Sequence, residues 1–223
     1  LYLLLMVNKD FIIVLAWPEL MCKLPGSWYD FFFRKTGKVR GGHSAIILVN
    51  SRNKRLYYMD NGRYHSPIGY SRIRDEETDH DIKISLLAKI KNDEIFNIEE
   101  ILKETFNKKA NHGGGTLYAS ILSRVNFQLA YSYAKEIQAR GAIPYGPFVI
   151  NGTNCSRFVA STIINSSPSF ITKLRLKYPY CIIPSPKRNV STCNRNYYVV
   201  DNKSCMKINR NILAGYFKGI ERL

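Results

Sequence analysis

The sequence lacks several features, and each absence argues against a class of protein. Its five cysteines are an odd number and include no Cys-x-x-Cys pair, so a closed disulfide framework and a zinc ribbon are not expected. No segment has the ~18 consecutive apolar residues of a membrane-spanning helix. P-loop, GxGxxG and HExxH motifs are missing as well, so we expect neither a cofactor nor a metal. We interpret the cysteines as reduced thiols of a cytoplasmic protein.

Length and composition indicate one globular domain. The chain has 223 residues, 45% of them hydrophobic, and a chain of this size buries roughly 70% of the surface that its unfolded state exposes. The apolar start is interrupted by Asn8, Lys9 and Asp10 and has no basic stretch ahead of it, so we expect no signal peptide. We therefore predict a single domain over residues 1–223.

Charge is unevenly distributed along the chain. Lys and Arg total 33 against 17 Asp and Glu, a formal net charge of +16. Residues 75–104 hold ten acids and four bases, whereas residues 173–223 hold eleven bases and two acids and are expected as a basic C-terminal extension. Such an extension could bind nucleic acid or another polyanion through phosphate contacts. Its bases are spaced singly among apolar residues, so a solvated surface is the favoured interpretation.

Apolar periodicity predicts an α+β protein. Expected strands cover residues 11–16, 43–50, 55–60 and 82–87, the second and third joined as a hairpin. Expected helices cover residues 27–33, 97–106, 127–137 and 155–163. Asn97 and Glu100 resemble a capping pair, and Gly141 resembles a C-terminal cap. Strands separated by helices but led by a hairpin favour an antiparallel sheet packed against helices over a doubly wound sheet.

Cys155 differs from the other cysteines in its position. A loop containing Gly152 leads into it and apolar residues at helical spacing follow, which predicts Cys155 in the first turn of a helix. The unpaired N–H groups and the dipole at a helix start stabilise a thiolate and lower the pKa of the thiol. This position is typical of a nucleophilic cysteine, but a cysteine there is more often a small buried residue.

A thiolate nucleophile needs a base, and His43 is the candidate. With the hairpin tip at residues 52–53, His43 lies opposite Gly62, and Asp60 becomes its diagonal neighbour on the same face of the sheet. Asp60 would then orient one ring nitrogen and leave the other for Cys155, as in a catalytic triad. A lone histidine is more often structural, so spacing alone leaves both interpretations open.

Two motifs resemble the circularly permuted NlpC-type papain-like superfamily, which includes lecithin retinol acyltransferase-like and YiiX-like thiol hydrolases. The matching residues are Gly42-His43-Ser44-Ala45, ahead of a β-branched strand, and Asn154-Cys155-Ser156-Arg157-Phe158-Val159, at a helix start. In that superfamily the His-bearing strand precedes the Cys-bearing helix. The resemblance covers the His-bearing hairpin at 40–65 and the Cys loop and helix at 140–165. It implies a permuted papain-like fold, in which Asp60 or His65 is the third member of the site.

The resemblance implies a cysteine hydrolase or acyltransferase that cleaves an amide or ester of a peptidoglycan-type peptide, another small peptide or an acyl group. The stretches WPELMCKLPGSWYD and YGPFVINGTNCSRFV also resemble a bacterial family of unknown function. We predict Cys155, His43 and Asp60 as catalytic residues. Tyr145, Asn154 and Trp17 are the predicted substrate-binding residues, although core packing is the favoured role for Trp17 and an equally open one for Tyr145. The alternative is a non-catalytic papain-like binding module that uses a basic surface for a polyanion.

Overall fold

A single antiparallel sheet organises the chain. The computed structural model describes residues 9–23, 38–146, 149, 151–178 and 185–211, and eight strands of these segments form the sheet, each pairing antiparallel with its neighbours. In spatial order they are β10 (Ile143–Pro144), β6 (Tyr70–Arg74), β5 (Leu56–Gly62), β4 (His43–Val49), β1 (Asp10–Trp17), β9 (Leu117–Val125), β11 (Tyr197–Val200) and β12 (Cys205–Ile208). Two short ribbons are separate from the sheet, β2 (Met21–Lys23) with β3 (Lys38–Arg40) and β7 (Ile90–Lys91) with β8 (Glu94–Ile95).

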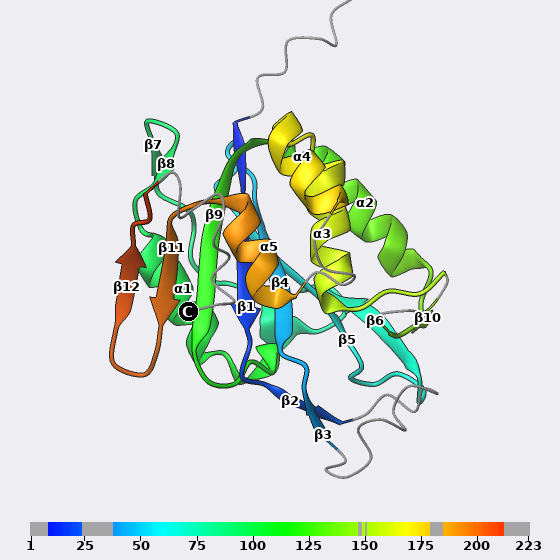
Figure 1. Cartoon of the computed structure of the whole chain (residues 1–223). Coiled ribbons are helices and arrows are strands. Elements are labelled where there is room, and N and C mark those ends of the chain that lie inside the picture. The colour runs from blue at the N-terminus through cyan, green and yellow to red at the C-terminus, as the bar shows by residue number, and fades with distance from the viewer. Residues whose placement is uncertain (1–8, 24–37, 147–148, 150, 179–184, 212–223) are drawn as a thin grey trace, which may run out of the picture.

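Helices cover both faces of the sheet (Figure 1). The helices of the described residues are α1 (Ile98–Asn107), α2 (Phe127–Ala139), α3 (Cys155–Asn165), α4 (Phe170–Lys177) and α5 (Pro186–Cys193). α2, α3 and α5 pack on one face, with α4 against α3 and α5, while α1 packs on the other face near β11 and β12. The arrangement is the mixed α+β class expected from the sequence.

β1 lies at the centre of the fold and is buried on both faces. Ile12 and Val14 belong to the apolar cluster beneath α2 and α3, whereas Ile13 and Leu15 belong to the cluster beneath α1. This double burial explains why the strand reads as a continuous apolar run rather than an alternating one. It also places the end of β1 next to the start of β4, because Trp17 is paired with His43.

The expected strand at 82–87 is wrong. A 3₁₀ turn covers His80–Ile82, and residues 83–89 have no regular structure, although burial alternates along them. The N–H groups of Ser85 and Leu86 donate to the carboxylate of Glu104 at 2.8 and 3.3 Å instead of to a neighbouring strand. The Glu104 side chain of α1 therefore accepts the hydrogen bonds that a neighbouring strand would have accepted in the expected sheet.

Two further differences concern a helix cap and an additional strand. α1 begins where expected, but the side chain of Asn97 makes no capping bond; it accepts from the N–H of Lys89 and donates to the carbonyl of Leu87. β9 is not among the expected elements. The helix expected at 27–33 lies outside the described residues.

The described part of the basic segment 173–223 belongs to the main body of the fold. It supplies α5, which packs on β1 and β9, and β11 and β12, which extend the sheet. Across the described residues, no helix is long and apolar enough to cross a membrane.

Candidate active site

The hairpin of β4 and β5 brings His43 beside Asp60. Ala45 lies directly opposite Asp60, which is the register expected from a tip at 52–53. His43 Nε2 donates a hydrogen bond to Asp60 Oδ2 at 2.9 Å, and both side chains are buried. Because the carboxylate engages Nε2, Nδ1 is the ring nitrogen left for a second partner.

The thiol of Cys155 is that second partner. Cys155 is the first residue of α3, as expected, and only 5% of it is exposed. His43 and Ser44 both act on the pKa of the thiol, and the thiol acts on the pKa of His43, so the sulfur lies close to the ring. The structure therefore brings Cys155, His43 and Asp60 together in one buried cluster.

The surroundings of His43, Cys155 and Asp60 favour the ionised form of each side chain. Burial opposes the charged form of His43, but its bonds to Asp60 and Cys155 outweigh burial and raise its pKa from 6.5 to about 9. Burial likewise opposes the Cys155 thiolate, but the hydrogen bond to His43 lowers the pKa of the thiol below its ordinary value. Despite burial, His43 and Arg74 hold the pKa of Asp60 well below its usual range. These shifts favour a thiolate–imidazolium pair over the neutral pair, beside an ionised carboxylate.

The start of α3 adds to this preference. Asn154 is the residue before the helix, and its Oδ1 accepts from the N–H of Arg157 at 2.8 Å. This cap fixes the first turn, where unpaired N–H groups and the helix dipole favour a negative sulfur at Cys155. Asn154, expected as a substrate-binding residue, is 8% exposed, and its observed contact is this capping bond.

Asp60 has two further partners that the sequence analysis does not identify. Arg74 Nε and Nη2 donate to its two oxygens at 2.9 and 2.6 Å, and the hydroxyl of Tyr58 donates to Oδ2 at 3.1 Å. Arg74 is 2% exposed and lies directly opposite Asp60 in the pairing of β5 with β6. An arginine facing an aspartate across two strands is the signal that would have found it, but the strand at 70–74 is not among the expected elements.

Arg74 is itself held from several sides. Its Nη1 donates to the carbonyl of Ala110 at 3.1 Å, and its guanidinium lies 4.8 Å from the ring centroid of Tyr64. The Tyr64 ring in turn stacks on His112, with the two centroids 3.6 Å apart. Because these contacts fix Arg74, they also fix the carboxylate that orients His43.

The other expected site residues differ in their surroundings. The ring of Trp17 is 2% exposed and stacks on His43, with centroids 5.7 Å apart. The Tyr145 hydroxyl lies 4.0 Å from Cys155 Sγ and points its donor at the thiol. Asp60 is the acid bonded to His43, whereas His65, the other candidate for the third member, is exposed on the connection that follows β5.

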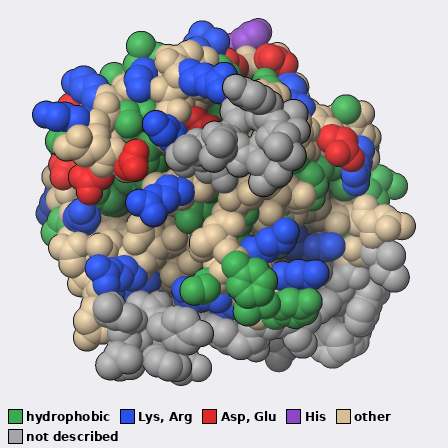
Figure 2. Space-filling model, turned by 90° about the horizontal axis from the view of Figure 1, so that it is seen from above, with side chains coloured by type: hydrophobic (Ala, Val, Ile, Leu, Met, Phe, Trp, Pro, Cys, Tyr) green, Lys and Arg blue, Asp and Glu red, His purple; other side chains and the backbone are tan. Residues whose placement is uncertain are grey.

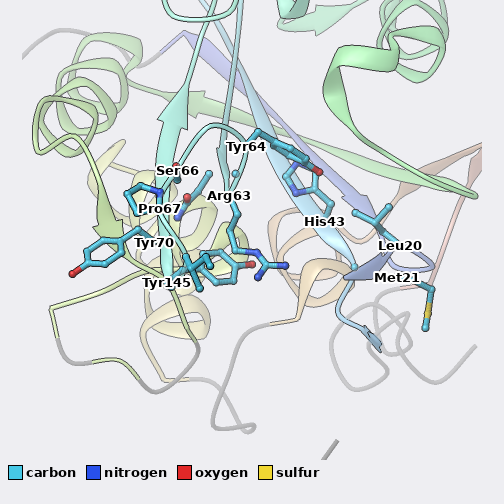
Figure 3. Close-up of a pocket in the computed structure, with 14 residues that line it drawn as sticks. Leu20, Met21, His43, Arg63, Tyr64, Ser66, Pro67, Tyr70 and Tyr145 are labelled. Carbon is cyan, nitrogen blue, oxygen red and sulfur yellow. The ribbon is translucent and has the colours of Figure 1, made fainter. Parts of the chain in front are cut away.

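A cavity of about 540 Å³ opens beside His43. Figure 3 shows His43 and Leu20 on one side, Tyr70 and Tyr145 on the other, and the side chain of Arg63 between them. The residues that line it include Arg63 but no Asp or Glu, so the wall favours a neutral or anionic ligand. His43 is part of this wall, so a bound molecule would lie beside the cluster of Cys155, His43 and Asp60.

Metal ligation has no support in the described part of the chain. No group of three or more His, Cys, Asp and Glu side chains lies close enough there to hold an ion. The acidic run near residue 75 instead forms ion pairs, with Asp75 and Glu77 both 2.7 Å from Lys135 and Asp79 2.7 Å from Arg72.

Fold and cluster together define an α+β protein with a buried Cys–His–Asp arrangement at a helix start. The chain belongs to the family described as type VI secretion system effector TseH-like, whose model matches residues 12–170. The crystal structure of the type VI secretion system effector TseH is similar, with a TM-score of 0.61 and 19% identity over 90% of this chain and 98% of that chain. At this identity the likeness supports the fold alone. None of the curated proteins matches the sequence.

Proposed function

We propose that this chain is a cysteine hydrolase or acyltransferase on a permuted papain-like fold, with Cys155 as nucleophile, His43 as general base and acid, and Asp60 as the group that orients the ring. The observation that carries the proposal is a buried thiol at the start of α3 whose pKa is lowered by a neighbouring imidazole, and that imidazole donates to a buried carboxylate. The order of a His-bearing strand before a Cys-bearing helix supports the permuted arrangement.

The reaction would proceed by acyl transfer to sulfur. The Cys155 thiolate attacks the substrate carbonyl, and its backbone N–H at the helix start and the Tyr145 hydroxyl are the donors nearest the oxyanion. The His43 imidazolium gives its proton to the leaving nitrogen or oxygen as the carbonyl carbon–heteroatom bond breaks. Neutral His43 then takes a proton from water or from an acceptor nucleophile, which releases the acyl group and regenerates the thiolate.

Family membership supports a role as an effector delivered through a type VI secretion system. We propose a peptidoglycan-type or other small peptide as substrate, because the cavity wall combines apolar and aromatic side chains with polar groups and one arginine. The cytoplasmic location expected from the sequence stays a prediction, and delivery to a recipient cell is the proposal that accompanies the effector role.

Iodoacetamide labelling tests the nucleophile. Burial raises the pKa of Cys193 to about 12, whereas the pKa of Cys155 lies below 9.0. The two shifts run in opposite directions, so the thiolate is favoured at Cys155 and disfavoured at Cys193. We expect peptide mapping at pH 7 to show Cys155 modified first, and His43→Ala to slow its modification. Equal labelling of Cys155 and Cys205 would refute the assignment of the nucleophile.

A second cavity supports anion binding as the alternative function. It has a volume of about 760 Å³, lies between β9, α4 and α5, and includes Arg124, Arg175 and Arg195 in its wall without any acid. Basic side chains elsewhere are spread over the surface among acidic ones, as Figure 2 shows for one face. Binding of a fluorescent single-stranded oligonucleotide should weaken steeply with salt if this cavity holds phosphates. No binding at low salt would remove the alternative.

A further inference from the structure

Asn61 is a buried amide without a hydrogen-bond partner among the described residues. It is 1% exposed, and neither Nδ2 nor Oδ1 is bonded to protein. Buried polar groups are nearly always paired, because an unmade bond leaves the cost of desolvation uncompensated. Asn97 and Asn154, by contrast, each use their amides in bonds to the backbone. The unpaired amide of Asn61 therefore needs an explanation.

The location of Asn61 supplies one. It follows Asp60 in β5, so its side chain leaves the opposite face of the strand, the face on which Met59 contributes to the cluster beneath α2 and α3. It also lines the cavity that contains His43 and Tyr145. Asn61 thus forms part of the wall of the cavity beside His43, and its side chain carries an unpaired donor and an unpaired acceptor.

Ser66 adds a second group of the same kind. Its hydroxyl oxygen is buried and has no partner among the described residues, and Ser66 lines the same cavity. Both groups can give and take a hydrogen bond. The wall therefore offers neutral hydrogen-bonding groups, and Arg63 is its charged member apart from His43.

We propose that Asn61 is a substrate-binding residue that recognises a secondary amide of the substrate. Nδ2 donates to the carbonyl and Oδ1 accepts from the N–H of one residue of an extended substrate, because these two groups of neighbouring peptide units lie on the same side of the chain. The inference rests on the proposed function and deepens it: the substrate carries a second amide beside the bond that reacts. A peptide-like chain meets this requirement, whereas a lipid acyl ester has no N–H to offer.

The test uses two electrophiles that differ at one atom. An N-acetyl dipeptidyl chloromethyl ketone alkylates Cys155 when the thiolate sulfur displaces chloride from the methylene carbon. The second probe carries a methyl group on the amide nitrogen that would face Oδ1, so it cannot donate to that oxygen. Second-order rates are measured for both probes on the wild-type chain, Asn61→Leu and Asn61→Ala. Asn165→Leu, at the exposed far end of α3, is the matched control.

We expect the unmethylated probe to react about tenfold faster on the wild type and on the control, the size of one hydrogen bond. In both Asn61 variants the ratio of the two rates should fall to about one. A ratio that stays near the wild-type value in the Asn61 variants would overturn the proposal, as would equal rates on the wild type.

Two further measurements distinguish failure of Asn61 recognition from failure of the proposed function and from a structural role of Asn61. Iodoacetamide labelling of Cys155 reports on the nucleophile alone, so loss of that labelling in the wild type refutes the proposed function, and its retention with an unchanged probe ratio refutes Asn61 recognition. Thermal unfolding reports on the fold. Leucine leaves no unpaired group, so Asn61→Leu should melt at or above the wild-type temperature; a clear fall would show that Asn61 serves the fold instead.

Discussion

Replacing Asp60 by asparagine tests whether its charge sets the reactivity of the thiol. Asparagine keeps the shape and an acceptor for His43 Nε2 but removes the negative charge that helps to raise the pKa of His43 to about 9. Without that charge, burial should return the pKa of His43 to its ordinary value of 6.5 or below. The thiolate of Cys155 then loses its cationic partner at pH 7.

The magnitude follows from the pKa values. A fall of about 2.5 units in the pKa of His43 lowers the equilibrium constant for forming the ion pair roughly 300-fold, and the hydrogen bond that asparagine retains reduces the loss. We expect iodoacetamide labelling of Cys155 at pH 7 to slow by between about 10-fold and about 300-fold, with the rate recovering at higher pH as the thiol ionises by itself. A labelling rate within about twofold of wild type, in folded protein, would refute the reasoning.

The variant also leaves Arg74 buried opposite a neutral side chain. Breaking a buried ion pair in this way costs about 3–5 kcal/mol, a large share of the stability of a typical domain. The control is the double variant Asp60→Asn/Arg74→Met, which removes the stranded charge. It should recover most of the free energy of unfolding but none of the labelling rate, so the two measurements separate folding from reactivity.

Three other perturbations have defined outcomes. First, the pKa of His43 is about 9 in the folded chain and 6.5 when unfolded, so its stabilisation is complete below pH 6.5 and is lost as the pH rises through 9. Urea unfolding should therefore show a loss of about 3 kcal/mol over this range that is absent in His43→Phe; a flat wild-type profile would contradict the raised pKa. Second, a Cβ at Gly113 would overlap the Trp17 ring, so Gly113→Ala should displace that ring from His43 and slow labelling of Cys155; an unchanged labelling rate would contradict a role for this stacking. Third, Tyr145→Phe removes a hydroxyl 4.0 Å from Cys155 Sγ and should slow labelling of Cys155 by less than about tenfold. Tyr70→Phe, in the same cavity wall, is the control; a Tyr145→Phe rate equal to that of the control would place Tyr145 outside the site.

Local patterns predicted the part of the site that lies within one hairpin or one helix start. The hairpin length fixed the register that makes Asp60 the diagonal neighbour of His43, and the apolar spacing after Cys155 fixed the start of α3. Both depend on residues close together in the sequence, where turn length and helical periodicity leave few alternatives.

Contacts between distant segments could not be predicted in the same way. Arg74 meets Asp60 only because β6 pairs with β5, and the segment after Gly62 shows no strong strand pattern. Residues 82–87 alternate like a strand, yet the carboxylate of Glu104 takes the place of a neighbouring strand. In both cases the structure depends on a contact with another element, and the local sequence does not indicate which element that is.

The contact between Gly42 and α5 has a practical consequence for where this protein can be shortened. Gly42 has a φ of +64°, and a Cβ there would lie 3.1 Å from the carbonyl of Trp17 and 3.2 Å from Pro186 at the start of α5. α5, which lies beyond residue 170 where the family match ends, thus packs close to the residue that precedes the His43 strand. A fragment trimmed to the matched region would lose this packing. It would also lose the Asn189 side chain that donates to the carbonyl of Ser156, so expression trials should retain the chain at least through β12.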